Sequence, residues 1–332
     1  MTESPNILVV GAGSAGKRHA QNLRNLGCRL SLVDPRQDRL EEASCQGATV
    51  GSFTDLRAAL DGSEFDGFVI ASPPALHVPQ AIAILERQRR WVLCEKPLGV
   101  TAVDARRLEA FSDRILLGYT YRWWPPIQAF RRKLLSEAIG RLRGMRFVMS
   151  AHLADWHPWE NYQGFFMANR ELGGGALLDE SHFIDLMLWM HAGPSKIYAQ
   201  VEKVSDLDIE TDDNVEAVVS FPDGVRVNMH LDLIGRPHER SILAVGDKGT
   251  LVYSYEENAV KVSGEQKSVW NIERYDCERN EMFVRVGQEF LALVKGSTAS
   301  PSCSVRDGIA ALEVVDACRE SSRSGKAVLL DG

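Results

Sequence analysis

The stretch that decides the fold is Gly11-Ala12-Gly13-Ser14-Ala15-Gly16, which follows the apolar run Asn6-Ile7-Leu8-Val9-Val10. An apolar run that leads into GxGxxG and then into a helical pattern predicts a strand, a tight turn and a helix. The missing side chains let a pyrophosphate approach, and the helix N-terminus supplies N–H groups for it. The alternative is a purely structural turn, because glycines punctuate many loops. The surrounding strand and helix favour dinucleotide binding.

An acidic residue stands where such a fold would need it. Asp34 ends the second expected strand, eighteen residues after Gly16. Its carboxylate can accept hydrogen bonds from the adenosine ribose and would repel a 2′-phosphate, so we expect NAD rather than NADP. Arg36 could swing toward such a phosphate. The alternative, which we favour, is a solvated side chain at a helix start.

The rest of the chain divides into two patterns. In the first third, apolar strands alternate with amphipathic helices, which predicts a doubly wound parallel sheet covered on both faces. After Trp123-Trp124-Pro125-Pro126 the strands become longer and alternate between apolar and polar residues, which predicts an antiparallel sheet. We therefore expect an α/β protein with a Rossmann domain over residues 1–122. Residues 123–332 would form a substrate-binding and oligomerisation α/β domain with a large open, mainly antiparallel sheet. The sequence leaves open whether the last helix packs on the first domain.

The individual elements follow from periodicity. Strands are expected at 6–10, 30–33, 66–71, 91–94 and 115–119, then at 146–152, 214–221, 225–233, 241–245 and 250–255. Helices are expected at 14–26, 35–44, 77–88 and 103–111, then at 175–190, 281–295 and 305–321.

Composition excludes several classes of protein. The 332 residues include 38 basic and 45 acidic side chains, and the net charge of −7 argues against nucleic-acid binding. The apolar runs are too short to span a bilayer, and the N-terminus lacks a signal-peptide pattern. Six cysteines are scattered without CxxC spacing, which argues against a metal site or a disulfide scaffold and favours the cytoplasm.

Two loops follow strands at the edge where a doubly wound sheet binds its ligand. Ser72-Pro73-Pro74 comes after the strand at 66–71, with His77 close behind, and Glu95-Lys96-Pro97 comes after the strand at 91–94. A lysine there could stabilise negative charge on a hydroxyl oxygen as hydride leaves. The alternatives are simple turns and a surface histidine at a helix start.

A third segment combines glycines with ionisable residues. Gly173-Gly174-Gly175 precedes Asp179, His182 and Asp185, which stand at i, i+3 and i+6 on one stripe of an otherwise apolar helix. A histidine can take a hydroxyl proton, and a neighbouring carboxylate can orient it. The alternative is a structural Asp–His pair in the core.

Together these residues resemble the Gfo/Idh/MocA family, the glucose–fructose oxidoreductase and inositol dehydrogenase group. The resemblance covers about the first 190 residues. Its pieces are the glycine turn, Ser72-Pro73-Pro74 with His77, Glu95-Lys96-Pro97, Gly118-Tyr119-Thr120-Tyr121-Arg122, Gly140-Arg141-Leu142, and Gly173-Gly174-Gly175 before His182 and Asp185.

The resemblance implies NAD(P)-dependent oxidation or reduction of a sugar, a sugar nucleotide or a cyclic polyol. By matching positions, Lys96 is the catalytic lysine and His182 the proton-transferring histidine. The family often has an Asp four residues before this histidine, but Leu178 stands there, so Asp179 either assists from a shifted angle or only caps the helix. Residues 155–159 with Tyr162 resemble a segment of members from polysaccharide and sugar-nucleotide pathways.

These arguments assign two sets of candidate residues. The substrate set adds two aromatic side chains, one near the cofactor segment and one that could stack on a sugar face, whose alternative is a core-packing loop. Its members are Lys96, Tyr121, Trp156, Asp179 and His182. The cofactor set is Gly11, Ala12, Gly13, Ser14, Ala15, Gly16, Asp34, Arg36, Ser72, Pro73, His77, Glu95, Lys96 and Arg122.

Two other functions stay open from the sequence. One is a non-catalytic dinucleotide-binding sensor or regulator, although the presence of Lys96 and His182 weighs against it. The other is an enzyme that retains its cofactor and cleaves glycosides by transient oxidation.

We also expect a homodimer or homotetramer, because the alternating strands of the second domain leave one sheet face without helices.

Overall fold

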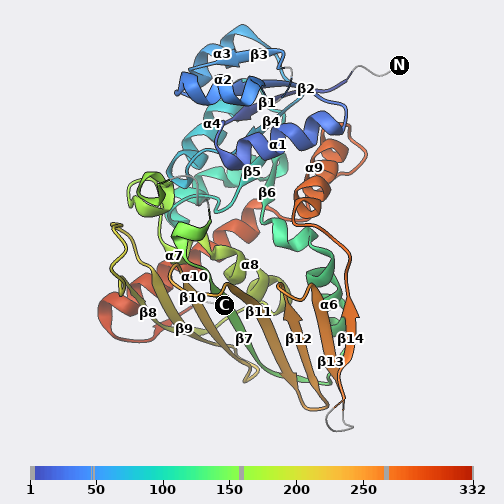
Figure 1. The fold of residues 1–332 in the computed structure, drawn as a ribbon, viewed down its shortest axis with the longest axis vertical. Helices are drawn as coiled ribbons and strands as arrows, with labels where there is room; N and C mark the ends of the chain where they lie inside the picture. The colour runs from blue at the N-terminus through green and yellow to red at the C-terminus, as the bar shows by residue number, and fades with distance from the viewer. Residues whose placement is uncertain (1–3, 46, 48, 157–160, 265–268, 331–332) are drawn as a thin grey trace. The chain divides into compact units, whose positions relative to one another are not determined.

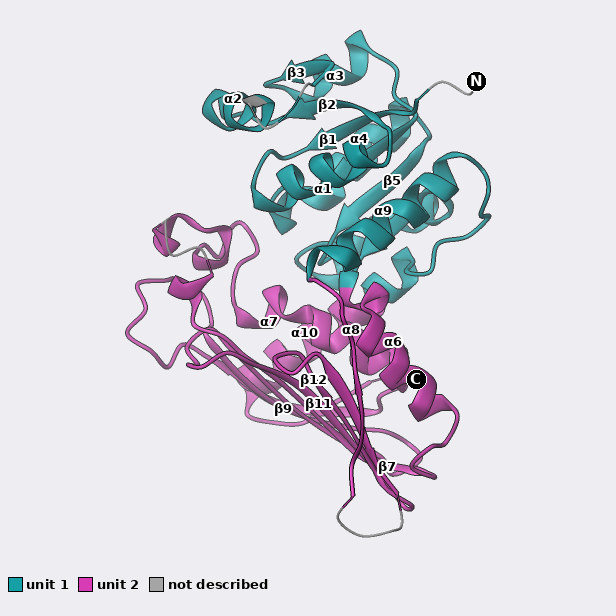
Figure 2. Cartoon of the chain, turned by 45° about the vertical axis from the view of Figure 1, so that its right-hand side comes forward, with its two compact units in different colours: residues 1–120, 279–309 teal, residues 121–278, 310–332 magenta. Residues whose placement is uncertain are grey.

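The computed structural model describes residues 4–45, 47, 49–156, 161–264 and 269–330. It forms two compact units, one of Met1–Thr120 with Arg279–Ile309 and one of Tyr121–Glu278 with Ala310–Gly332 (Figure 2). The first unit therefore ends two residues before the expected boundary and takes back a later segment. That segment holds the helix before the last one and the first turn of the last helix, whereas the sequence left open only that the last helix packs on this unit.

The first unit contains a six-stranded sheet in the order β3-β2-β1-β4-β5-β6. Each neighbouring pair is parallel. The order is that of a Rossmann fold, so the predicted fold class is confirmed. The inner strands β1, β4 and β5 and the edge strand β6 are almost entirely buried, because helices cover both faces of the sheet (Figure 1). Their bounds are β1 Asn6–Val10, β2 Arg29–Val33, β3 Gly51–Phe53, β4 Gly67–Ile70, β5 Trp91–Glu95 and β6 Ile115–Gly118.

Helices from both ends of the chain complete this unit. Helix α9 (Asn280–Val294) lies beside α1 (Ser14–Asn25), as Figures 1 and 2 both show. The side-chain amides of Asn22 and Asn280 exchange hydrogen bonds of 3.0 and 2.9 Å. The remaining helices are α2 Gln37–Cys45, α3 Leu56–Gly62, α4 His77–Arg87 and α5 Ala102–Ala105. The helix expected at 103–111 is only one α-helical turn, followed by a 3-10 helix at Arg106–Arg114.

The second unit contains a nine-stranded sheet in the order β14-β13-β12-β11-β7-β10-β9-β8-β15. All pairs are antiparallel except the parallel pair of β7 and β10, which confirms the expected mainly antiparallel sheet. The strands are β7 Leu142–Ser150, β8 Lys196–Glu202, β9 Asn214–Ser220, β10 Arg226–Asp232, β11 Glu239–Gly246, β12 Thr250–Ser254, β13 Ala259–Ser263, β14 Asn271–Arg274 and β15 Val328–Leu329.

Alternation along these strands separates two faces. On β10, Val227, Met229 and Leu231 are buried, whereas Arg226 and Asn228 are exposed. The helices of this unit lie on the buried face (Figure 2). They are α6 Pro125–Leu135, α7 Ala176–Asp179, α8 Ser181–Met190 and α10 Val305–Ser324. No helix in the described ranges is long and apolar enough to cross a membrane.

Candidate functional site

The glycine turn between β1 and α1 requires glycine for steric reasons. Gly11 has φ of +97°, and a Cβ there would lie 2.7 Å from the carbonyl oxygen of Ala71. A Cβ on Gly16 would lie 1.8 Å from the carbonyl oxygen of Gly11. At Gly13 the nearest atom to a Cβ would be Arg39 Nη1, at 3.9 Å. The turn is thus packed tightly against the protein at Gly11 and Gly16 and has room at Gly13.

Helix α1 begins directly after this turn. Gly13 is its N-cap residue, and no side chain of the described structure caps the helix. The N–H groups of Ser14, Ala15 and Gly16 are those that an α-helix leaves without an intrahelical acceptor. Such a helix start, next to a turn with room for a ligand, fits the pyrophosphate of a dinucleotide.

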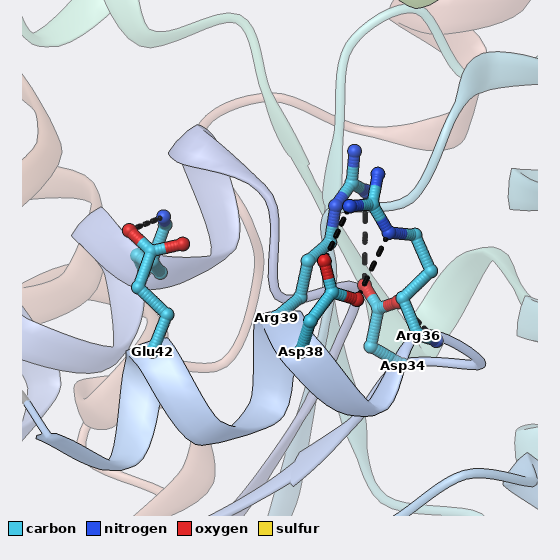
Figure 3. Close-up of polar contacts among 6 residues, drawn as sticks. Asp34, Arg36, Asp38, Arg39 and Glu42 are labelled. Atoms are coloured by element: carbon cyan, nitrogen blue, oxygen red, sulfur yellow. Dashed lines mark hydrogen bonds and ion pairs between the residues drawn. The ribbon is translucent and has the colours of Figure 1, made fainter.

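Asp34 lies immediately after β2 and faces this turn (Figure 3). Its side chain is buried, and its oxygens accept hydrogen bonds from the backbone N–H groups of Ala12, at 2.8 Å, and Arg36, at 2.9 Å. The Arg39 guanidinium comes within 3.9 Å of the same carboxylate. Asp34 therefore connects the glycine turn to the start of α2, where an adenosine ribose would lie.

The two arginines near Asp34 have different partners. The side chain of Arg36 donates to Asp38 over 3.1 and 2.5 Å, and both side chains are more than half exposed. The Arg39 guanidinium forms an ion-pair contact of 3.9 Å with Asp34 (Figure 3) and would be the nearest group to a Cβ at Gly13. Arg39 was not predicted, because nothing in the local pattern of α2 separates it from other basic residues on a helix.

His77 lies at the start of α4 and is only 1% exposed. Its Nδ1 is 2.7 Å from the carbonyl oxygen of Pro97, and its Nε2 is 2.8 Å from that of Ser72. Burial lowers the pKa of His77, although the two carbonyls oppose that shift. Both ring nitrogens thus face protein carbonyls, whereas we had expected this side chain to face the cofactor. The Ser72 hydroxyl donates to Gln80 over 2.6 Å.

Glu95 ends β5, and Lys96 follows it at the carboxyl edge of the parallel sheet. The Glu95 carboxylate accepts a 2.6 Å hydrogen bond from His19 Nε2 and a 3.2 Å bond from the Lys96 backbone N–H. Burial would raise the pKa of Glu95, but the bond from His19 and the nearby Lys96 ammonium hold it below its ordinary value. Glu95 is thus an ionised buried group, and the half-buried Lys96 stands beside it.

In the second unit, His182 lies among aromatic side chains. Its ring is 4.9 Å from that of Tyr121 in an edge-on arrangement. The Tyr121 ring is 6.5 Å from Tyr255, which stacks on Trp124 at 6.0 Å. The guanidinium of Arg240 lies over the Tyr255 ring, 4.4 Å from the ring centre. Sequence analysis found Tyr121 and His182 but missed Tyr255 and Arg240.

The helix expected over 175–190 is interrupted before His182. Helix α7 ends at Asp179, Glu180 adopts a turn conformation, and α8 begins at Ser181. The single helical stripe that we expected for Asp179 and His182 is therefore wrong. Asp179 and Glu180 are both buried, at 5% and 4% exposure. The charge of Glu180 is one of those that raise the pKa of Arg240, against the lowering effect of burial.

Arg122 and Asp185 form a buried ion pair within the second unit. Arg122 Nε and Nη2 donate to the two Asp185 oxygens over 2.9 and 2.6 Å. The two side chains are 4% and 2% exposed. This pair engages the Arg122 guanidinium, which we expected to contact the cofactor, and it accounts for the polar position Asp185 on an apolar helix.

Trp156 follows the short 3-10 helix Leu153–Asp155 and is half-buried. Asp155 beside it accepts two hydrogen bonds from Arg236, of 2.7 and 2.8 Å. Residues 157–160 of the segment that our sequence analysis singled out lie outside the described residues. Within the described ranges, no cluster of His, Cys, Asp and Glu has the geometry of a metal site.

Comparisons with known proteins match both parts of the chain. Residues 5–114 match the GFO/IDH/MocA model described as an oxidoreductase family with an NAD-binding Rossmann fold. Residues 127–252 match the GFO/IDH/MocA C-terminal domain.

Curated relatives and solved structures align along almost the whole chain. Inositol 2-dehydrogenase of Acidothermus cellulolyticus is 27% identical over 98% of this chain and 94% of its own length. Levoglucosan dehydrogenase of Pseudarthrobacter phenanthrenivorans is 22% identical over 96% of each chain. The fold resembles levoglucosan dehydrogenase in complex with NADH and L-sorbose, with a TM-score of 0.87 at 20% identity over 99% of this chain and 100% of that one. It also resembles the WlbA dehydrogenase of Bordetella pertussis in complex with NADH and UDP-GlcNAcA, with a TM-score of 0.80 at 21% identity over 99% of each chain.

Proposed function

We propose, because the chain belongs to the GFO/IDH/MocA family of NAD-binding oxidoreductases, that it is a dehydrogenase or reductase of CH–OH groups. Its substrate would be a sugar, a sugar nucleotide or a cyclic polyol. The observation that carries the proposal is the match to both family domains in one chain, with Lys96 after β5 at the sheet edge of the glycine turn. Relatives named as inositol and levoglucosan dehydrogenases support the substrate class.

The cofactor would be held at the start of α1. Its pyrophosphate would accept hydrogen bonds from the N–H groups of Ser14, Ala15 and Gly16, and Asp34 would accept from the ribose hydroxyls. When bound, the nicotinamide ring supplies the group that accepts or donates hydride. Asp34 further supports a preference for NAD, because its buried carboxylate would repel a 2′-phosphate.

The chemistry of the chain's own residues concerns charge and proton transfer at the substrate oxygen. The Lys96 ammonium would donate a hydrogen bond to that oxygen and stabilise the negative charge that develops there. His182 would accept the hydroxyl proton in oxidation and return it in reduction, and Asp179 would assist His182.

The remaining substrate contacts would come from aromatic residues of the second unit. Tyr121 lies against His182, and Tyr255 carries the Arg240 guanidinium on its ring. Aromatic faces suit the CH-rich face of a sugar ring. The guanidinium would donate hydrogen bonds to hydroxyl or acidic groups. Trp156 would contribute a further ring face.

One screen tests the proposed function. Cyclic polyols, free sugars and nucleotide sugars are each incubated with the protein and NAD⁺, and NADH absorbance is followed, with Lys96→Ala as the control. We expect NADH to accumulate with at least one substrate and only in the wild type. A substrate consumed without NADH in solution would instead favour the cofactor-retaining glycosidase. Cofactor binding without any turnover would favour the sensor.

The outer face of the nine-stranded sheet supports an oligomer. Tyr198, Val218 and Val245 expose 40–45% of their surface and alternate with the buried residues of their strands. The helices of this unit lie on the buried face (Figure 2). We propose a homodimer or homotetramer that covers this face. Light scattering checks it, and the 36.9 kDa mass of a monomer would contradict it.

The buried cysteines bear on where the protein works. Cys28, Cys94 and Cys318 are thiols, and burial raises the pKa of each. Such thiols fit a reducing compartment, so the cytoplasm stays our proposal for the location.

A further inference from the structure

The two residues that flank Lys96 are each tied to a buried histidine of the first unit. On the N-terminal side, His19 Nε2 donates to the Glu95 carboxylate over 2.6 Å. On the C-terminal side, His77 Nδ1 lies 2.7 Å from the carbonyl oxygen of Pro97. His19 is 0% exposed and His77 is 1% exposed. The lysine thus sits between two neighbours that are held by groups out of reach of water.

The histidines connect the lysine turn to different parts of the Rossmann fold. His19 lies on α1, one helical turn after Gly16, so its bond joins the turn to the helix that follows the glycines. The Nε2 atom of His77 lies 2.8 Å from the carbonyl oxygen of Ser72, in the loop after β4. Lys96 is therefore connected both to the glycine helix and to the neighbouring loop.

We propose that His19 and His77 are positioning residues for Lys96, because they fix the backbone on either side of it. This rests on the proposed function, in which Lys96 acts on the substrate oxygen. With Glu95 and Pro97 held, the backbone from which the Lys96 side chain extends is fixed. Ionised carboxylates only accept hydrogen bonds, so the contact of His19 with Glu95 needs an N–H on Nε2 of His19. Burial lowers the pKa of His77, and a neutral imidazole carries one N–H, so His77 donates to one of its two carbonyl oxygens and packs against the other. Losing a buried hydrogen bond of this kind frees the turn to shift.

A labelling experiment tests the inference without any substrate. The protein is acetylated with limiting acetic anhydride, and mass spectrometry compares the labelling of Lys96 with that of the exposed Lys248 in the same sample. We expect His19→Leu and His77→Phe each to change this ratio by about threefold or more, since Lys96 gains new positions relative to its neighbours. His77→Gln retains an amide NH2 group that can donate to a carbonyl oxygen, so it should change the ratio less.

A matched variant separates this effect from lost stability. Leu60→Ala removes a buried side chain of α3 in the same unit, away from the lysine turn. It should lower the melting temperature and leave the labelling ratio of Lys96 unchanged. If the histidine variants lower the melting temperature but give the wild-type ratio, His19 and His77 only stabilise the fold and the inference is wrong.

Turnover gives a second, independent readout once the screen has identified a substrate. A misplaced catalytic group commonly costs about 10²-fold, so kcat of His77→Phe should fall by roughly 10–100-fold while NADH affinity changes much less. In the Lys96→Ala background the same substitution should cost less than about threefold, because the residue it positions is gone. Equal losses in both backgrounds would overturn the inference. Full turnover by Lys96→Ala alone would instead overturn the proposed function. The labelling experiment would still test whether the two histidines position Lys96, because it uses no substrate.

Discussion

The substitution Asp34→Asn should shift the cofactor preference from NADH toward NADPH. In the wild type, both carboxylate oxygens accept backbone hydrogen bonds, from Ala12 and Arg36, and the side chain is only 3% exposed. Asparagine keeps one acceptor oxygen and loses the charge. Arg39, which lies 3.9 Å from the carboxylate, then loses its counter-ion and becomes able to pair with a 2′-phosphate.

The expected magnitude follows from the charge and the lost acceptor. Two unit charges about 5 Å apart in an effective dielectric constant of about 20 repel by about 3 kcal/mol. Removing that repulsion should lower the ratio of the NADPH and NADH dissociation constants on the order of 10²-fold. Asparagine also offers the ribose hydroxyls one acceptor oxygen fewer, at a cost of about 1 kcal/mol, so NADH itself should bind roughly fivefold more weakly.

Fluorescence titration with NADH and NADPH measures both constants. Asp38→Asn is the matched control, since it removes a carboxylate that pairs with Arg36 and leaves Asp34 in place. It should leave the ratio nearly unchanged. Adding Arg39→Ala to Asp34→Asn should remove part of the gain for NADPH. A ratio that stays within about threefold of the wild type in Asp34→Asn would refute the electrostatic reasoning.

Three further changes have expected outcomes. Lys96→Ala should lower kcat by roughly 10²–10⁴-fold with NADH affinity nearly intact, and turnover within about threefold of the wild type would contradict its role. Asp185→Asn leaves Arg122 buried beside a neutral partner, so chemical denaturation should show a loss of about 3–5 kcal/mol, and a loss below about 1 kcal/mol would contradict a buried ion pair. Hydrogen bonds to Asp232 and Glu216 raise the pKa of His230 from 6.5 to about 9. Its contribution should be complete below pH 6.5 and lost as pH rises through about 9, so melting temperatures of the wild type and His230→Asn should converge there.

The first unit was readable from the sequence because its signals are local. A buried strand, a glycine turn and an amphipathic helix follow one another within twenty residues. Because strands joined by helices form parallel sheets with right-handed connections, few arrangements of the strands are possible. Strand β3 escaped notice because its three residues are too few to show a period. The sequence also did not predict that residues 279–309 pack within the first unit, because a helix pattern does not say which surface the helix covers.

The candidate site was readable only in part. Lys96 and Asp34 follow strands, so the edge on which they lie could be inferred. Arg240 and Tyr255 meet across the hairpin of β11 and β12, where the Tyr255 N–H donates to the Arg240 carbonyl over 3.0 Å. The alternation of apolar and polar residues along each strand does not say which residues of the two strands stand opposite one another. The break at Glu180 was not predicted because the apolar pattern continues across it, with Leu177 and Leu178 before it and Phe183 and Ile184 after it.

The late segment inside the first unit sets an order for biosynthesis. Helix α9 covers α1 through contacts such as Asn22 with Asn280 and His19 with Phe283, yet residue 279 is made about 160 residues after residue 120. At roughly 5–20 residues per second, a ribosome needs on the order of ten seconds or more to supply it. During that interval the nascent Rossmann unit exposes the surface that α9 later covers. A chain cut after residue 120 would keep that surface exposed for good, and should be a client of chaperones and proteases rather than a usable cofactor-binding fragment.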